Sequence, residues 1–265
     1  MSVSPGARIH PSALVENGAT IADGASVGPF TVIGPEVVLG PDVQIDSHCV
    51  ITGWTEIGEG TRVFPFCSIG EIPQDLKFGG ERTRLRIGAR NRIREHVTMN
   101  TGTAQGGAET VVGSDGLFMA GCHVAHDCVI GDRVIVVNQS ALAGHCRIED
   151  EVIVGGLSGV HQWVRIGRGA IIGALSMVTN DVVPYGLVQG PRAELDGLNL
   201  VGLKRRGVAR ADIQALRAAL LTLKQGDGTF HERAVRLGED ATSDYVREMV
   251  DFITGASGRS FLVPR

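Results

Sequence analysis

Aliphatic side chains recur at every sixth position along most of the first 180 residues. The series begins with Ile9, Val15 and Ile21, and it ends with Ile172 and Val178. An amphipathic helix repeats its apolar positions every three to four residues and a half-buried strand every two, so neither explains a period of six. A solenoid of short strands does, because each turn of the chain returns an aliphatic residue to the same core. The pattern therefore predicts a stacked β-solenoid.

Turn residues separate the aliphatic positions. Gly and Asp follow many of them, as in Ile57-Gly-Glu-Gly and Ile130-Gly-Asp-Arg, and both residue types tolerate the backbone angles of tight turns. Three hexads make one triangular coil of 18 residues. Successive coils should stack about 4.8 Å apart through strand pairing, which gives roughly ten coils in a prism.

Two polar, Gly-rich segments interrupt the repeat, at residues 71–86 and 100–111. The first keeps the phase of the repeat, whereas the second shifts it by one residue. Both are too polar to pack in the core, so we expect them to be loops. Binding residues concentrate in loops that a rigid scaffold holds.

The pattern changes after Pro184. Ile213, Leu216 and Leu223 follow helical spacing. Thr229 with Glu232 forms a capping box that starts a second helix, and Ser243 is a candidate cap for a third. We therefore expect a β-helix over residues 1–190 and a small α-helical domain over residues 191–265.

Composition narrows the possible functions. The net charge of −4 argues against a nucleic-acid-binding protein. No apolar run is long enough to span a membrane and no signal peptide is visible, so we expect a cytoplasmic protein. Each cysteine follows an aliphatic repeat position by four residues, the small inward slot of the hexad, so we expect buried thiols rather than disulfides or zinc ligands. The five are Cys49, Cys67, Cys122, Cys128 and Cys146.

Four histidines lie close together in the sequence and outside the inward slots: His123, His126, His145 and His161. We expect all four to point away from the core. The 18-residue period places Gly144 above His126 and His145 above Asp127. An imidazole beside a carboxylate can act as a general base, and the Gly144 N–H could stabilise an oxyanion.

Metal binding is the main alternative for these histidines. A trimeric solenoid can collect three imidazoles around zinc, as a γ-class carbonic anhydrase does. Here Gln162 follows His161, and the first insert supplies Gln74, Asp75 and Lys77. These residues suit a sugar or a phosphate better, so we expect no metal at the site.

Four stretches resemble the UDP-N-acetylglucosamine 3-O-acyltransferases of lipid A biosynthesis. The motifs AHDC, AGH, VHQ and GLKRRG in this order are far more specific than the hexad repeat, and the resemblance covers nearly the whole chain. The stretches are IGEIPQDLKFGGERTRLRIGARNRIREHVT, HVAHDCVIGDRV, AGHCRIEDEVIVGGLSGVHQWVRIG and LNLVGLKRRG.

The resemblance implies a left-handed parallel β-helix and a homotrimer with active sites between subunits. It implies transfer of an R-3-hydroxyacyl chain from acyl carrier protein to the 3-hydroxyl of UDP-N-acetylglucosamine, without a cofactor. His126 would be the general base, Asp127 its partner and Gly144 the oxyanion donor. The residues implied to hold the sugar nucleotide or the acyl-pantetheine arm are Gln74, Asp75, Lys77, His123, His145, His161, Gln162, Asn199, Arg205 and Arg206.

The sequence departs from the family pattern at three positions. Asn100 replaces a histidine that is common in relatives, Val201 replaces an acidic residue, and Ala174 replaces a glycine in the acyl groove, which Met119 also lines. The extra methyl group of Ala174 predicts a chain preference no longer than that of glycine-bearing relatives. N-acylation of a 3-amino sugar analogue stays open as an alternative reaction.

Overall fold

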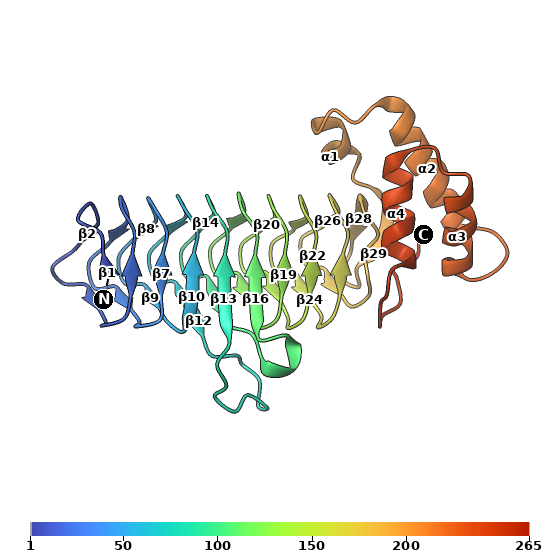
Figure 1. Cartoon of the computed structure of the whole chain (residues 1–265). Coiled ribbons are helices and arrows are strands. Elements are labelled where there is room, and N and C mark those ends of the chain that lie inside the picture. The colour runs from blue at the N-terminus through green and yellow to red at the C-terminus, as the bar shows by residue number, and fades with distance from the viewer. Residues whose placement is uncertain (1, 265) are drawn as a thin grey trace.

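Most hexads of the repeat form a two-residue strand and a turn in the computed structural model, which describes residues 2–264. The strands build three sheets around a triangular core, which makes a left-handed parallel β-helix (Figure 1). Neighbouring coils pair in register, as in Val129 with Arg147 and Ile130 with Ile148. The prediction from the six-residue repeat is confirmed.

We name the sheets A, B and C. Sheet A contains β1 (Ser2–Val3), β4 (Thr20–Ile21), β7 (Val38–Leu39), β10 (Trp54–Ile57), β13 (Arg84–Ile87), β16 (Glu109–Val112), β19 (Val129–Ile130), β22 (Arg147–Ile148) and β25 (Arg165–Ile166). Sheet B contains β2 (Arg8–Ile9), β5 (Ser26–Val27), β8 (Gln44–Ile45), β11 (Arg62–Val63), β14 (Arg92–Ile93), β17 (Leu117–Phe118), β20 (Ile135–Val136), β23 (Ile153–Val154), β26 (Ile171–Ile172), β28 (Gly186–Gln189) and β29 (Glu194–Leu198). Sheet C contains β3 (Leu14–Val15), β6 (Val32–Ile33), β9 (Val50–Ile51), β12 (Ser68–Glu71), β15 (Thr98–Asn100), β18 (His123–Val124), β21 (Ala141–Leu142), β24 (Gly159–Val160) and β27 (Met177–Val178).

The core of the β-helix is a stack of aliphatic residues and small inward side chains. The repeat positions from Ile21 to Val178 are buried, and so are all five cysteines, each of which is a free thiol. The prediction that the cysteines occupy inward packing positions is confirmed. Cys128 and Cys146 lie in the same turns as the histidines, but their thiols point inward and donate to the carbonyl groups of Ala143 and His161.

The turns fall on three edges of the prism, and one edge collects the unusual sequence features. We call it the C–A edge, because its turns lead from a sheet C strand to the next sheet A strand. Both insert loops lie there, at residues 72–83 and 101–108, and η1 (Ala104–Gly106) is a short 3-10 turn in the second. The loops project from the prism on one side (Figure 1). The turns that carry His126, His145 and His161 follow on the same edge.

The helices close one end of the prism. They are α1 (Leu200–Arg205), α2 (Arg210–Lys224), α3 (Phe230–Glu239) and α4 (Asp244–Thr254). The capping box predicted for Thr229 and Glu232 is present. Ser243 precedes α4 as predicted, but its hydroxyl binds Asp212 Oδ1 at 2.7 Å instead of capping the helix.

The β-structure extends beyond residue 190, where we expected the helical domain to begin. Strand β29 pairs antiparallel with β28 and prolongs sheet B to Leu198, so helices begin only at Leu200. The two leucines of β29, Leu195 and Leu198, are three positions apart, a spacing that does not continue the six-residue repeat. In residues 2–264, no helix is both long enough and apolar enough to cross a membrane.

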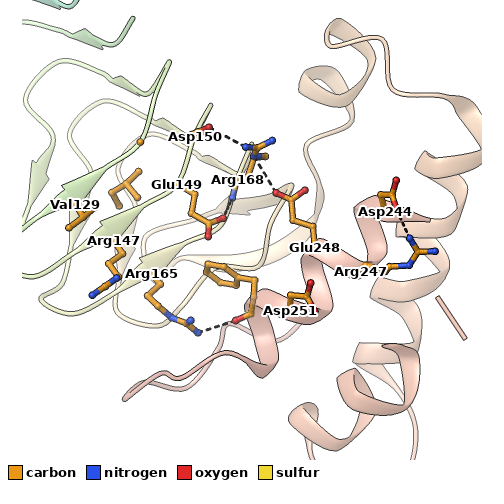
Figure 2. A pocket seen from close by; sticks show the side chains of 13 residues that line it. Val129, Arg147, Glu149, Asp150, Arg165, Arg168, Asp244, Arg247, Glu248 and Asp251 are labelled. Atoms are coloured by element: carbon orange, nitrogen blue, oxygen red, sulfur yellow. Dashed lines mark hydrogen bonds and ion pairs between the residues drawn. The ribbon is translucent and has the colours of Figure 1, made fainter. Parts of the chain in front are cut away.

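A polar cleft of about 780 Å³ lies between the end of the β-helix and α4. Figure 2 shows Arg168 between Asp150 and Glu248. Its guanidinium lies 3.1 Å from Asp150 Oδ2 and 3.2 Å from Glu248 Oε1, and the Arg165 guanidinium donates to the Phe252 carbonyl. These contacts join sheet A to the last helix. They fix the helical domain against the prism.

Candidate active site

His126 and Asp127 form a hydrogen-bonded pair in the turn between β18 and β19. His126 Nδ1 lies 2.8 Å from Asp127 Oδ2, and the side chains are only 6% and 0% exposed. A carboxylate only accepts hydrogen bonds, so the imidazole donates from Nδ1. The neutral imidazole therefore carries its lone pair on Nε2, which is the arrangement of a general base.

The second insert loop holds the Asp127 carboxylate in place. The Thr103 N–H donates to Oδ1 at 2.8 Å, and the Thr103 hydroxyl donates to Oδ2 at 2.7 Å. Gly106 lies against the same carboxylate, and a Cβ there would be 2.1 Å from its carbon atom. The loop thus buries His126 and Asp127 on the outside of the prism. His126 points away from the core as predicted, but it is buried beneath this loop.

Gly144 lies directly above the His126 ring, as the 18-residue period predicted. A Cβ at Gly144 would be 2.6 Å from His126 Nε2 and 2.5 Å from Cε1, so only glycine leaves room for the imidazole. Among the described residues, none accepts a hydrogen bond from the Gly144 N–H. This donor is therefore free to bind a ligand oxygen next to the His126 lone pair.

His145 is the second imidazole beside Asp127, which also agrees with the spacing argument. Its Nδ1 lies 3.7 Å from Asp127 Oδ2, and its ring meets that of His126 edge to face, with 5.0 Å between centroids. Burial lowers the pKa of His145 and outweighs the opposing effect of the Asp127 charge. The Trp163 indole covers the other face of His145.

His123 lies in β18, one turn before His126. Its Nδ1 is 2.7 Å from the Thr98 hydroxyl, which fixes the ring plane. Burial is the main cause that lowers the pKa of His123. The ring is thus held in its uncharged form, able to offer one nitrogen to a ligand hydroxyl.

His161 and Gln162 are exposed on the same edge, two coils from the His126–Asp127 pair. A segment near the C-terminus packs against this part of the edge: Arg259 donates to His161 Nδ1 at 2.7 Å and to the Thr179 carbonyl at 2.7 Å. Two backbone hydrogen bonds between Asp181 and the segment around Phe261 anchor this tail. Sequence reasoning missed Arg259, because no motif marks it and 98 residues separate it from His161.

The first insert loop carries Gln74, Asp75 and Lys77. Gln74 and Lys77 are exposed, and Asp75 Oδ1 accepts the Lys77 N–H at 3.0 Å. Asn100 supports the base of the loop, because its amide donates to the Ile72 carbonyl at 3.0 Å. The Asn100 Oδ1 atom is buried without a partner. One acceptor near the loop is therefore left for a water molecule or a ligand.

A family model and two curated relatives match the sequence. The model described as UDP-N-acetylglucosamine O-acyltransferase, domain 2, matches residues 181–262. The acyl-(acyl-carrier-protein)–UDP-N-acetylglucosamine O-acyltransferase of Paracoccus denitrificans is 65% identical over 202 residues, which are 76% of this chain and 77% of the relative. The enzyme of the same name from Caulobacter vibrioides is 58% identical over 219 residues, 82% of this chain and 83% of the relative.

Solved structures agree with the sequence comparison over almost the full length. LpxA from Acinetobacter baumannii has a TM-score of 0.92 at 37% identity, and the match covers 96% of this chain and 99% of that one. The UDP-N-acetylglucosamine acyltransferase of Campylobacter jejuni has a TM-score of 0.91 at 37% identity, covering 97% and 100%. The chain belongs to the UDP-N-acetylglucosamine O-acyltransferase family.

The remaining residues that the family resemblance implied lie away from the C–A edge of this acyltransferase chain. Asn199 caps α1 and donates to the Gly169 carbonyl at 2.9 Å, and Arg206 pairs with Glu151 at 3.3 Å. Gly169 and Glu151 belong to the edge between sheets A and B. Arg205 is exposed.

Met119 and Ala174 lie on the third edge, between sheets B and C. Ala174 is exposed and Met119 half-buried. Together with the residues near α1, they place the expected ligand contacts on all three edges. A single acyltransferase chain does not bring them to one place.

His126, Asp127 and His145 also have the spacing of a metal site, since one ligand atom of each lies within 4.8 Å of the others. The Asp127 carboxylate, however, already accepts three hydrogen bonds, two from Thr103 and one from His126. A metal ion would have to displace them. The donor set therefore fits the hydrogen-bonded pair of an acyltransferase better than a metal centre.

Proposed function

We propose that this protein transfers an R-3-hydroxyacyl chain from acyl carrier protein to the 3-hydroxyl of UDP-N-acetylglucosamine, which is the first step of lipid A biosynthesis. Family membership and the names of the relatives support the reaction. The single structural observation that carries the proposal is the His126–Asp127 pair beneath the free N–H of Gly144. It combines a base and an oxyanion donor, the two groups that direct acyl transfer requires.

In this mechanism His126 Nε2 takes the proton of the sugar 3-hydroxyl. The oxygen attacks the thioester carbonyl carbon, and the Gly144 N–H donates to the oxyanion that forms. The C–S bond then breaks, and the imidazolium gives its proton to the departing thiolate. A new ester and a free thiol result. Asp127 keeps the Nδ1 proton in place and stabilises the imidazolium, as a carboxylate does in related acid–base pairs.

The site residues on the first insert loop suit the sugar nucleotide. Asp75 and Lys77 face the same edge as His126, and Asp75 contributes to the electrostatic environment of His145. A carboxylate can accept from sugar hydroxyls and a lysine can bind a phosphate oxygen. We assign Gln74, Asp75, Lys77 and His123 to the sugar nucleotide.

A homotrimer would bring the separated edges together. The catalytic pair lies on the C–A edge, whereas Met119 and Ala174 lie on the edge between sheets B and C. If three prisms pack side by side, one edge of each subunit meets a different edge of its neighbour. The acyl chain would then lie against Met119 and Ala174 of the next subunit. We assign Asn199, Arg205 and Arg206 to ligand binding on the family resemblance, since Asn199 and Arg206 contact the edge between sheets A and B in one subunit.

Mass spectrometry of the product tests the reaction. The purified protein is incubated with R-3-hydroxyacyl carrier proteins of graded chain length and with either UDP-N-acetylglucosamine or its 3-amino analogue. Formation of the 3-O-acyl ester with the ordinary sugar supports the proposal. Exclusive formation of an amide with the 3-amino sugar would replace it by N-acylation, and no acylated product with either sugar would reject it.

Mixed trimers test the shared site. His126→Ala blocks the base, and Ala174→Trp fills the acyl groove, so each homotrimer should be inactive. If each site forms between two subunits, a mixed trimer contains some sites that take His126 from one variant and Ala174 from the other. These sites carry neither substitution, so the mixture should recover part of the wild-type activity. A mixture without recovery would place the whole site within one chain.

A further inference from the structure

Trp163 occupies the repeat position directly above His145, in the column that begins with Asp127. The Trp163 N–H donates to the Gly144 carbonyl at 3.1 Å, and the His145 N–H donates to the His126 carbonyl at 3.0 Å. All three column residues have positive φ, 59° at Asp127, 63° at His145 and 67° at Trp163. The backbone therefore stacks their side chains at the spacing of neighbouring coils.

The indole and imidazole rings are in face-to-face contact. Their centroids are 3.8 Å apart and their planes differ by 4°. His145 is thus enclosed between the Trp163 indole and the Asp127 carboxylate, and its side chain is 14% exposed. Trp163 itself is 56% exposed, and its contact with the imidazole covers one face of the indole.

Both histidines lie near Asp127 Oδ2, which also accepts from the Thr103 hydroxyl. Oδ2 accepts from His126 at 2.8 Å and lies 3.7 Å from His145 Nδ1. If His145 is uncharged and cannot rotate toward Asp127, it does not disturb the hydrogen bond from His126 Nδ1 to Oδ2. A hydrated His145 would protonate more readily and would move toward the carboxylate, which would weaken the hydrogen bond that orients the base.

We propose that Trp163 is a positioning residue for catalysis: its indole shields His145 from water and holds the imidazole in place, so that only one of the two histidines, His126, donates to Asp127. This inference rests on the proposed function for its kinetic consequences. The contact itself does not depend on which acyl acceptor is used.

The charge of His145 depends on groups from several elements. Burial lowers its pKa, the charges of Asp127 and Asp75 act in the opposite direction, and His126 adds to the lowering. A cleft of about 560 Å³ next to His145 and Trp163 is lined by three cationic side chains, those of Arg147, Arg165 and Arg259. Trp163 has two opposing effects on the imidazolium: exclusion of water destabilises it, whereas contact with the indole face stabilises it. The direction in which the pKa of His145 changes in a Trp163 variant shows which effect is larger.

The experiment compares Trp163→Ala with Trp163→Phe, which keeps a flat ring over His145. Phe30→Ala is the matched control, because Phe30 is likewise exposed, has positive φ and contacts a histidine ring, with 5.1 Å between its centroid and that of His48. The pH profile of kcat/KM and the 13C-histidine NMR titration of His145 are recorded for each protein.

For Trp163→Ala we expect kcat/KM to fall about tenfold at pH 7, mainly through kcat, because the base is misoriented rather than removed. The pKa of His145 should rise, so the acid limb of the profile should move to higher pH and the loss should be smaller at pH 8.5 than at pH 6. Trp163→Phe should restore most of the activity. Phe30→Ala should resemble the wild type.

Three results would overturn the inference: an equal loss at every pH, a fall in the pKa of His145, or no rescue by phenylalanine. The His145 titration is observed without turnover. If the wild-type protein fails to transfer acyl chains but His145 titrates as expected, the proposed function is wrong and the role of the indole stands. If the wild type is active and the titration does not move, only the inference about Trp163 is wrong.

Discussion

Replacing Asp127 by asparagine should reverse the tautomer of His126. Asp127 Oδ1 accepts from the Thr103 N–H at 2.8 Å, so an asparagine must place its carbonyl oxygen there. Its NH2 group then takes the place of Oδ2 and faces His126 Nδ1 and the Thr103 hydroxyl. The hydroxyl can accept from this group, but His126 Nδ1 must also become an acceptor. The proton moves to Nε2, and the base is blocked.

The expected loss in kcat follows from the contribution of the general base. General-base catalysis contributes about 10² to 10⁴ in rate, and the geometry of the site is otherwise intact, so we expect kcat to fall about a thousandfold. That corresponds to about 4 kcal/mol of transition-state stabilisation. The KM for the sugar nucleotide should change little, because Asp127 is fully buried and does not contact solvent.

The assay is steady-state acyl transfer with a thermal unfolding curve for each protein. Asp115→Asn is the matched control: Asp115 has φ 60° and pairs with Arg90 at 2.7 Å, on the edge between sheets A and B. It should keep wild-type activity. An Asp127→Asn protein that is folded and retains more than about a tenth of wild-type kcat would refute the tautomer argument.

Three further substitutions test other parts of the site. Gly144→Ala places a methyl group 2.6 Å from His126 Nε2, so kcat should fall more than about a hundredfold in a folded protein; near-normal turnover would mean that the ring has another position. Cys128→Ala should leave kcat within about twofold, since the Cys146 thiol and burial raise the pKa of Cys128 and keep it as a thiol; loss of turnover in a folded variant would indicate a thiol mechanism. Ala174→Gly should extend the range of acyl chains toward longer ones by about tenfold in kcat/KM, measured with graded acyl carrier proteins; an unchanged profile would contradict a role for this residue in chain selection.

The six-residue period predicted the β-helix and much of the geometry around His126. Each coil contains 18 residues, so the spacing placed Gly144 above His126 and His145 above Asp127, and both predictions are confirmed. The same spacing leads from His145 to Trp163, so the stacked indole was also within reach of this reasoning. A strict repeat makes sequence distance a direct measure of position along an edge.

The contacts that the sequence did not predict lie where the repeat ends or is interrupted. Thr103 holds Asp127 from the loop that shifts the phase, so counting residues cannot place it. Arg259 reaches His161 from the C-terminal tail, whose path depends on how the helices pack. Strand β29 forms an antiparallel pair with a shift in register, which a period of six does not describe. Tertiary packing, rather than local pattern, decides all three.

Single-turnover acyl transfer by His126→Ala tests the central claim most directly. The variant is mixed with UDP-N-acetylglucosamine and an R-3-hydroxyacyl carrier protein, and the 3-O-acyl product is quantified by mass spectrometry while sugar-nucleotide binding is measured separately. The account predicts a folded protein that binds the sugar nucleotide but forms product at least about a hundredfold more slowly than the wild type. Transfer at a rate near that of the wild type would contradict the assignment of His126 as the general base.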